Sequence, residues 1–337
     1  MNTNLRSTTV CPSGAAVTVL ILGLAGAGLL SAVGCAPQWG YSDREIYCCG
    51  QQGVFVLNMD QAQKDPTARV WTWTPADSPE IPVEHQIWFR AMDECKPVMG
   101  GQAVLVCSSS NGGVAVIRRS DKKCLFYAGG KGVHSAEVLP GFATAEPGDL
   151  LAVALSTPFN QVRLYKLALG EMAAKPLYAM KLPGAHGVVW DRQRRVLWAL
   201  GTDSLLRLVV DPVKFLEVVG QYPLPRRGGH DLSPIGERTL AVTVWEGVYQ
   251  FDAEKETFSP LPALAERAGM KSVSRHPKTG QFIFVQAHQQ SRPVDGGQAE
   301  QDDDRGAAIG TLDGQTVRLA PTLIYKARWN ASHSLGK

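Results

Sequence analysis

The chain has 337 residues, of which 45% are hydrophobic and 19% are charged, with 34 glycines, 21 prolines and a formal net charge of +3. This composition is typical of a globular protein built from short strands and turns, and it excludes a largely disordered chain. The small net charge gives no reason to expect nucleic-acid binding. The sequence also lacks a phosphate-binding glycine loop, a Gly-x-Ser-x-Gly elbow and a His-Glu-x-x-His motif, which excludes the hydrolase and nucleotide-binding classes that these motifs mark.

The first 35 residues differ in character from the rest of the chain. A short polar start containing Arg6 is followed by an apolar run, and this run ends in small residues before Cys35. The pattern resembles a bacterial lipoprotein signal, which implies cleavage before Cys35 and lipidation of its thiol. The alternative is a simple N-terminal anchor, because about 19 apolar residues can just span a bilayer. Both interpretations predict an exported protein that touches the membrane only through its anchor. Its expected location is the outer membrane and periplasm or the cell surface.

Five cysteines remain after the leader, namely Cys48, Cys49, Cys95, Cys107 and Cys124. An exported compartment permits disulfides, yet three of these cysteines fall in predicted strands, where a thiol behaves as a small buried apolar group. We expect buried thiols, and the sequence leaves the disulfide state open.

A short phrase occurs four times, beginning at Val133, Ala185, Gly229 and Met270, so that successive copies are 52, 44 and 41 residues apart. Each copy opens an extended segment, which is followed by a turn and a second apolar strand. A period of about 40 to 45 residues with four strands per unit is typical of a β-propeller blade. We therefore predict an all-β chain with a single β-propeller over residues 45–330, a tether at residues 36–44 and a C-terminal tail at residues 331–337.

The number of blades follows from the inner strands, which we expect within residues 88–98, 134–139, 186–190, 230–234, 271–276 and 325–329. Six blades are favoured, and seven remain the alternative because the pattern around residues 75–100 is ambiguous. The N-terminal strands lack an inner partner, and the last strand of the chain supplies it. Pairing of the two terminal strands would close the ring and remove its exposed edges.

One insertion, residues 291–306, contains Asp302, Asp303 and Asp304. These carboxylates lack the spaced oxygen ligands and the turn glycine of a calcium loop. A solvated loop is the expected structure.

The starts of the inner strands should meet in one funnel, because all inner strands of a propeller run in the same direction along the channel. Alignment of the phrases places His134, His186, His230 and Lys271 at one level. Their predicted counterparts are Asp93 or Glu94 in the second blade and Lys326 in the first. Two residues further along, the alignment gives Ala136, Val188, Leu232, Val273 and Arg328, so that a mostly apolar channel is expected below the funnel.

Two chemistries suit these residues. In one, His134, His186 and His230 bind a divalent metal such as zinc or manganese, with Asp93 or Glu94 as a further ligand. In the other, a histidine abstracts a proton beside a carboxylate that Lys271, Lys326 and Arg328 hold, while Trp190 offers a stacking face for a sugar ring. A structural role is the competing interpretation, since a histidine at the start of an inner strand commonly bonds to the backbone of the next blade.

The phrases around His134, His186, His230, Lys271 and Lys326 resemble an uncharacterised family of bacterial β-propeller lipoproteins with YVTN/WD40-like architecture. A looser similarity, in architecture only, links the chain to propeller polysaccharide lyases such as the oligogalacturonate and ulvan lyases. The family carries no established reaction, so the resemblance implies the exported propeller fold more than a function. The funnel residues predict that the protein acts on anionic carbohydrate, with β-elimination as the expected reaction. The alternative is a non-catalytic propeller that binds a glycan or a protein at the cell surface. The oligomeric state is not predictable from the sequence.

Overall fold

The computed structural model describes residues 41–51, 53–109, 112–143, 147–211, 213–287, 306, 308–314, 316–318, 323–330 and 335. The residues from Gly40 to Lys337 form one compact unit. The expected leader with Cys35, most of the tether, the insertion with Asp302, Asp303 and Asp304 up to residue 305, and most of the tail lie outside the described residues. None of the helices within these ranges is both long enough and apolar enough to cross a membrane.

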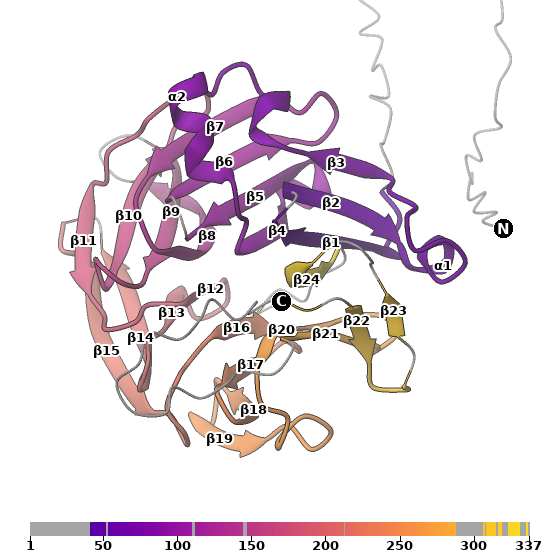
Figure 1. Cartoon of the computed structure of the whole chain (residues 1–337). Helices are drawn as coiled ribbons and strands as arrows, with labels where there is room; N and C mark the ends of the chain where they lie inside the picture. Colours follow the sequence, from indigo (N-terminus) through magenta and orange to yellow (C-terminus); the bar gives the residue numbers. More distant parts are fainter. Residues whose placement is uncertain are drawn as a thin grey trace, which may run out of the picture. The chain divides into compact units, whose positions relative to one another are not determined.

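The described chain folds into six antiparallel sheets of four strands each, which surround a common centre (Figure 1). The strands of the first three blades, from the centre outward, are β24 (Ile324–Trp329), β1 (Glu45–Gly50), β2 (Gly53–Asn58) and β3 (Trp71–Trp73); β4 (Glu94–Val98), β5 (Ala103–Ser108), β6 (Gly113–Arg118) and β7 (Cys124–Gly129); β8 (Val133–Ala143), β9 (Pro147–Leu155), β10 (Gln161–Leu167) and β11 (Tyr178–Lys181). Those of the last three are β12 (Gly187–Asp191), β13 (Val196–Leu200), β14 (Ser204–Asp211) and β15 (Phe215–Pro223); β16 (Asp231–Pro234), β17 (Thr239–Val244), β18 (Gly247–Asp252) and β19 (Thr257–Pro260); β20 (Met270–Arg275), β21 (Phe282–Gln286), β22 (Ala308–Thr311) and β23 (Thr316–Arg318). The prediction of a six-bladed propeller is confirmed.

Within the described residues, helix is confined to short turns between strands. These are α1 (Met59–Ala62), η1 (Pro75–Asp77), α2 (Val83–Gln86), η2 (Ile87–Phe89) and η3 (Met99–Gly101). Three of them occupy the connection between β3 and β4, which is the region that was ambiguous in sequence. The inner strand of the second blade therefore begins at Glu94 rather than near residue 88, because the preceding residues fold into η2.

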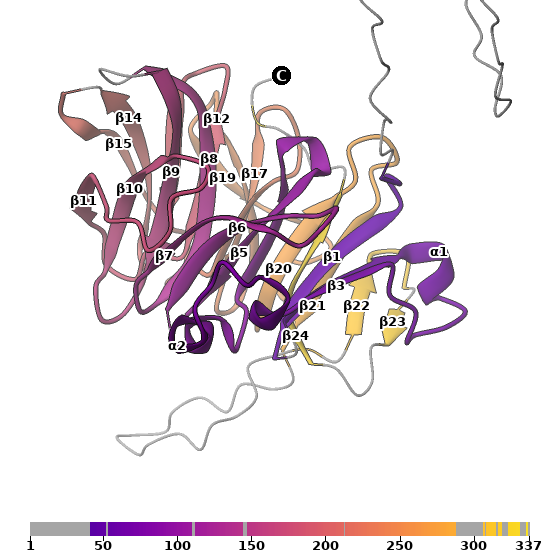
Figure 2. The same cartoon turned by 90° about the horizontal axis from the view of Figure 1, so that it is seen from above.

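The ring is closed by the two ends of the propeller, as predicted. Strand β24 is the inner strand of the first blade and pairs antiparallel with β1, for example Ile46 with Trp329. Each inner strand also contacts the inner strand of the next blade, in the order β24, β4, β8, β12, β16, β20 and back to β24. Figure 2 shows the same blades seen after a quarter turn.

Neighbouring inner strands are joined by side chains that accept backbone N–H groups. The N–H of Val273 donates to Oδ2 of Asp231 (3.2 Å), and the N–H of Ala327 donates to Oγ of Ser272 (3.0 Å). In the same way the N–H of Val188 donates to Oγ of Ser135 (3.5 Å). These bonds satisfy inner-strand N–H groups that have no strand partner on the channel side.

The core lies between the faces of adjacent blades. Strands such as β5 and β13 are buried along their whole length, which explains why their sequences are continuous apolar runs rather than alternating ones. The outermost strands β15 and β19 alternate or are exposed. Cys48, Cys49, Cys95, Cys107 and Cys124 are all free and buried, so the expectation of buried thiols holds in the structure.

Candidate functional site

An extra residue in the register marks the start of three inner strands, β8, β20 and β24. In the register of β8 with β9, Val133 pairs with Leu155 and Ser135 with Ala154, so that His134 is an extra residue. Lys271 and Tyr325 are extra in the same way in β20 and β24. In the remaining blades the equivalent position is the residue just before the inner strand, namely Asp93, His186 or His230. Its N–H group donates to the carbonyl group of the residue that pairs with the first residue of that strand.

The structurally equivalent residues are therefore Asp93, His134, His186, His230, Lys271 and Tyr325. The sequence alignment is wrong by one position in the first blade, where it selected Lys326 instead of Tyr325. The physical reason is the bulge, because an extra residue lets two successive side chains turn to the same side of a strand. Tyr325 and Lys326 accordingly both contact residues of the channel.

Five of these side chains meet at one end of the channel, and we call them the histidine mouth: His134, His186, His230, Lys271 and Tyr325. The rings of His134 and His186 are stacked with centroids 4.0 Å apart, and those of His186 and His230 are 5.0 Å apart. The structure thus brings the three predicted histidines together. Each keeps partial exposure to solvent.

Hydrogen bonds orient two of the imidazoles. Nδ1 of His186 lies 2.9 Å from the carbonyl oxygen of Gly184. A carbonyl only accepts, so Nδ1 carries the proton and Nε2 presents a lone pair. Nε2 of His230 lies 3.0 Å from Nζ of Lys271 and 3.2 Å from the hydroxyl of Tyr325. Because the ammonium group of Lys271 can only donate, this nitrogen accepts its hydrogen bond.

The surroundings keep the three imidazoles neutral at neutral pH. Burial lowers the pKa of His186 to about 4, and the charges of Lys326 and Lys271 act in the same direction. Burial likewise holds the pKa values of His134 and His230 well below their usual range, with further lowering by His186 beside His134 and by Lys271 beside His230.

A metal site does not fit this arrangement. Within the described part of the chain, no group of three or more His, Cys, Asp or Glu side chains is placed to hold a metal ion. His134 and His186 stack face to face, and the ammonium group of Lys271 lies against His230, where it would repel a cation. The expectation of zinc or manganese on His134, His186 and His230 is not supported by the geometry.

Directly below the mouth, four charged side chains form a buried ion network: Glu94, Asp231, Lys326 and Arg328. Arg328 binds both carboxylates in two-pronged fashion, with Nε 3.0 Å and Nη2 2.9 Å from Glu94, and Nη1 2.8 Å from Asp231. Nζ of Lys326 lies 3.0 Å from Asp231 and 3.2 Å from Glu94. None of the four is more than 4% exposed.

Attraction inside this network outweighs the cost of burial. Burial alone would raise the pKa of Glu94, but the charges of Arg328 and Lys326 hold it at about 2, and they lower the pKa of Asp231 further still. The network corrects two expectations. The channel below the mouth is charged rather than apolar, and Glu94, Lys326 and Arg328 form ion pairs within the network, while Arg328 also lines a cavity at the other end of the channel. Asp93 is also buried, and it accepts the N–H of Ser109.

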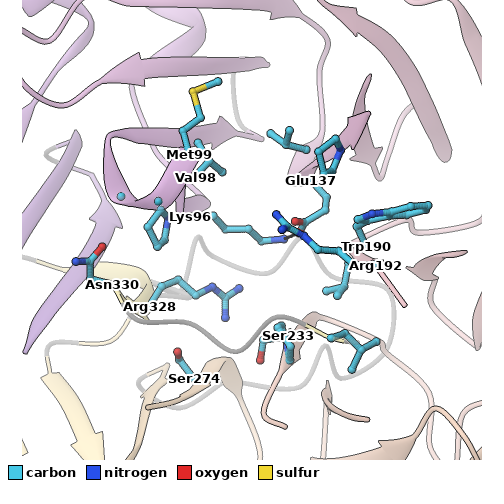
Figure 3. A pocket seen from close by; sticks show the side chains of 18 of the residues that line it. Lys96, Val98, Met99, Glu137, Trp190, Arg192, Ser233, Ser274, Arg328 and Asn330 are labelled. Carbon is cyan, nitrogen blue, oxygen red and sulfur yellow. Dashed lines mark hydrogen bonds and ion pairs between the residues drawn. The ribbon is translucent and has the colours of Figure 1, made fainter. Parts of the chain in front are cut away.

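The other end of the channel holds a cavity of about 630 Å³, lined by the later residues of the inner strands (Figure 3). Nζ of Lys96 lies 3.1 Å from Glu137 and 2.9 Å from the carbonyl oxygen of Val188, and Arg192 also lines the cavity. Trp190 belongs to this end of the channel and is 6% exposed, so the structure does not place it beside the histidines. Sequence reasoning missed Lys96 and Arg192, which no repeated phrase marks.

A model described as a family of unknown function, DUF6528, matches residues 43–334, and the chain belongs to this family. No curated protein matches. Among solved structures, a protein of unknown function from Bacteroides caccae is similar with a TM-score of 0.51 at 10% identity, covering 85% of this chain and 98% of that one. Kuenenia stuttgartiensis hydrazine synthase follows with a TM-score of 0.47 at 12% identity, covering 67% and 65%. At these identities the first likeness supports the fold alone.

The buried ion network predicts a large effect of Glu94→Gln. The substitution leaves two buried cations facing one carboxylate, and we expect the free energy of unfolding to fall by about 3 to 5 kcal/mol, measured by urea denaturation. The double variant Glu94→Gln, Lys326→Gln restores the charge balance and should recover part of the loss. A single variant within about 1 kcal/mol of the parent would contradict the network's role.

The depressed histidine pKa values predict loss of stability in mild acid. The unfolded chain takes up protons near pH 6.5, whereas native His186 does so only near pH 4. The stability contributed by the neutral rings is therefore complete above about pH 6.5 and declines toward pH 4, by at most about 1.4 kcal/mol per pH unit for each histidine. Melting temperatures between pH 7.5 and pH 4.5 check this. The double variant His134→Gln, His186→Gln should flatten the decline, and an equally steep decline in that variant would contradict the prediction.

Proposed function

We propose that this member of the DUF6528 family is an exported, lipid-anchored propeller that cleaves acidic oligosaccharides by β-elimination at the histidine mouth. The observation that carries the proposal is the orientation of His186. Its Nδ1 is committed to the carbonyl group of Gly184, and its pKa is about 4. A neutral base with a free Nε2 is therefore present at neutral pH at the end of the channel.

The other groups of the histidine mouth supply the remaining steps. Nε2 of His186 removes the proton on the carbon beside the uronate carboxylate, and the positive charge of Lys271 stabilises the enolate-like transition state. The electron pair then forms the carbon–carbon double bond as the bond to the glycosidic oxygen breaks. The hydroxyl of Tyr325 protonates that leaving oxygen, and both side chains return to their starting states by proton exchange with water.

The division of roles follows from the contacts. Lys271 is 1% exposed and lies 3.0 Å from His230, so that it acts through its charge from beneath the rings. The hydroxyl of Tyr325 lies 3.2 Å from the same histidine nitrogen. His230 is thus a positioning residue that holds the acid and the cation together.

Elimination leaves a conjugated double bond, so the reaction is followed by ultraviolet absorbance. The parent protein should raise the absorbance with at least one polymer from a panel of polygalacturonate, alginate and glucuronan. His186→Ala should lower the rate at least about 100-fold while the melting temperature stays nearly unchanged, because the ring is partly exposed. His85→Ala on α2 is the matched control and should retain full activity.

A flat absorbance trace across the whole panel would reject the lyase. If calorimetry then still detects binding of one of these glycans, the non-catalytic glycan-binding propeller is the function that remains. If His186→Ala unfolds the protein, the ring has a structural role and the assignment of the base fails.

Export and lipidation rest on the residues around Cys35. Expression with a fatty-acid analogue should label the parent protein, and Cys35→Ala should abolish the label and release the protein from the membrane fraction. A labelled Cys35→Ala variant, or an unlabelled parent that stays membrane-bound, would favour the simple N-terminal anchor.

A further inference from the structure

Trp245, which directly follows β17, is the one aromatic residue among the exposed large hydrophobic side chains of the described residues, and it is 53% exposed. A tryptophan usually buries most of its surface. Single exposed apolar residues are common and need no explanation by themselves, so the case depends on where this ring lies and on what holds it there.

The chain around Trp245 places it at the rim of the histidine mouth. Its ring lies against the backbone of Gly228, where a Cβ atom would overlap the indole, and Gly228 stands two residues before His230. The carbonyl oxygen of Trp245 accepts the N–H of Gly269 at 3.0 Å, and Gly269 stands two residues before Lys271. Trp245 is thus tied to the entry segments of β16 and β20.

Those two segments deliver a pair of side chains that touch, because Nζ of Lys271 and Nε2 of His230 are 3.0 Å apart. Two residues of chain span at most about 7 Å, so the indole lies against a chain segment that leads directly into the histidine mouth. Gly228 has a φ of 86°, a conformation that favours glycine, and any larger residue there would displace the ring. The position of the indole is therefore determined by backbone contacts on one side, while its exposed surface faces solvent.

Polar groups suited to sugar hydroxyls flank the ring. Arg226 lies 2.7 Å from Glu246, and Arg227 lies 2.8 Å from Asp203. All four side chains are more than 40% exposed. Exposed ion pairs of this kind contribute little to stability. Their side chains can therefore leave one another and bind a ligand instead.

We propose that Trp245 is the stacking platform of a carbohydrate subsite at the rim of the histidine mouth, with the two flanking ion pairs binding the hydroxyl and carboxylate groups of the same ligand. The proposal rests on the proposed function and adds the residue that holds the next sugar ring beside the reacting one. An aromatic face that is preordered by the backbone binds an apolar sugar face with little loss of side-chain entropy.

Binding is measured by isothermal titration calorimetry with trigalacturonate, trimannuronate and triglucuronate, in the His186→Ala background so that no turnover occurs. The His186→Ala protein should bind at least one of the three. The double variant His186→Ala, Trp245→Ala should bind that sugar about tenfold or more weakly than His186→Ala does, as truncation of an anchoring aromatic residue does. The double variant with Trp245→Phe should lose less affinity. Leu169→Ala is the control, because Leu169 is 58% exposed and follows β10 in another blade, and it should leave the affinity unchanged.

The subsite is overturned if His186→Ala binds the sugar equally well with and without Trp245→Ala. It is also overturned if His186→Ala binds none of the three sugars. Failure of the lyase gives a different pattern. Binding that depends on Trp245 without an absorbance change in the parent protein keeps the subsite and rejects elimination. Elimination with an unchanged KM in Trp245→Ala keeps the lyase and rejects the subsite.

Discussion

The ion network of Glu94, Asp231, Lys326 and Arg328 is the interaction on which the rest of the channel depends. It joins the inner strands of the first, second and fifth blades, and so it crosses the channel instead of merely linking neighbours. Two carboxylates and two cations balance in charge, and the two-pronged contacts of Arg328 use geometry that only a guanidinium provides. The network lies between the histidine mouth, where Nζ of Lys326 is 3.4 Å from the carbonyl oxygen of His134, and the cavity at the opposite end, which Arg328 lines.

The ion network also determines which charges remain at the mouth. Since Lys326 and Arg328 neutralise the buried carboxylates, the mouth keeps Lys271 as its cation together with three imidazoles whose pKa values are lowered mainly by burial. An imidazolium is disfavoured there, because it would lie against Lys271 and above Lys326. The mouth therefore presents neutral imidazoles beside a positive charge, an environment that disfavours binding of a cation.

The fold could be predicted from the sequence because the repeated phrase and its spacing are visible without a structure. The spacing of the phrases beginning at Val133, Ala185, Gly229 and Met270 predicts blades, and the unpaired N-terminal strands predict closure by the last strand. The charged channel was not predictable, because its geometry depends on a bulge that leaves no mark in composition or spacing. The sequence alignment made Lys326 the equivalent of Lys271 because both residues are lysines. The strand registers instead make Tyr325 the equivalent of Lys271. Trp245 and Arg192 lie in or beside connections, where the repeat gives no guidance.

The bulge also explains how one phrase combines a structural and a chemical position. The residue after the histidine or lysine of the phrase joins the blades, as Ser135, Asp231 and Ser272 do through the N–H groups of the next inner strand. The bulged residue itself is unpaired on one side of the ladder and turns toward the channel end, so packing does not dictate its type. This accounts for the range of groups found there, from imidazole to ammonium and phenol. In a fold whose blades otherwise repeat, the type of side chain varies at the position that the ladder leaves unconstrained.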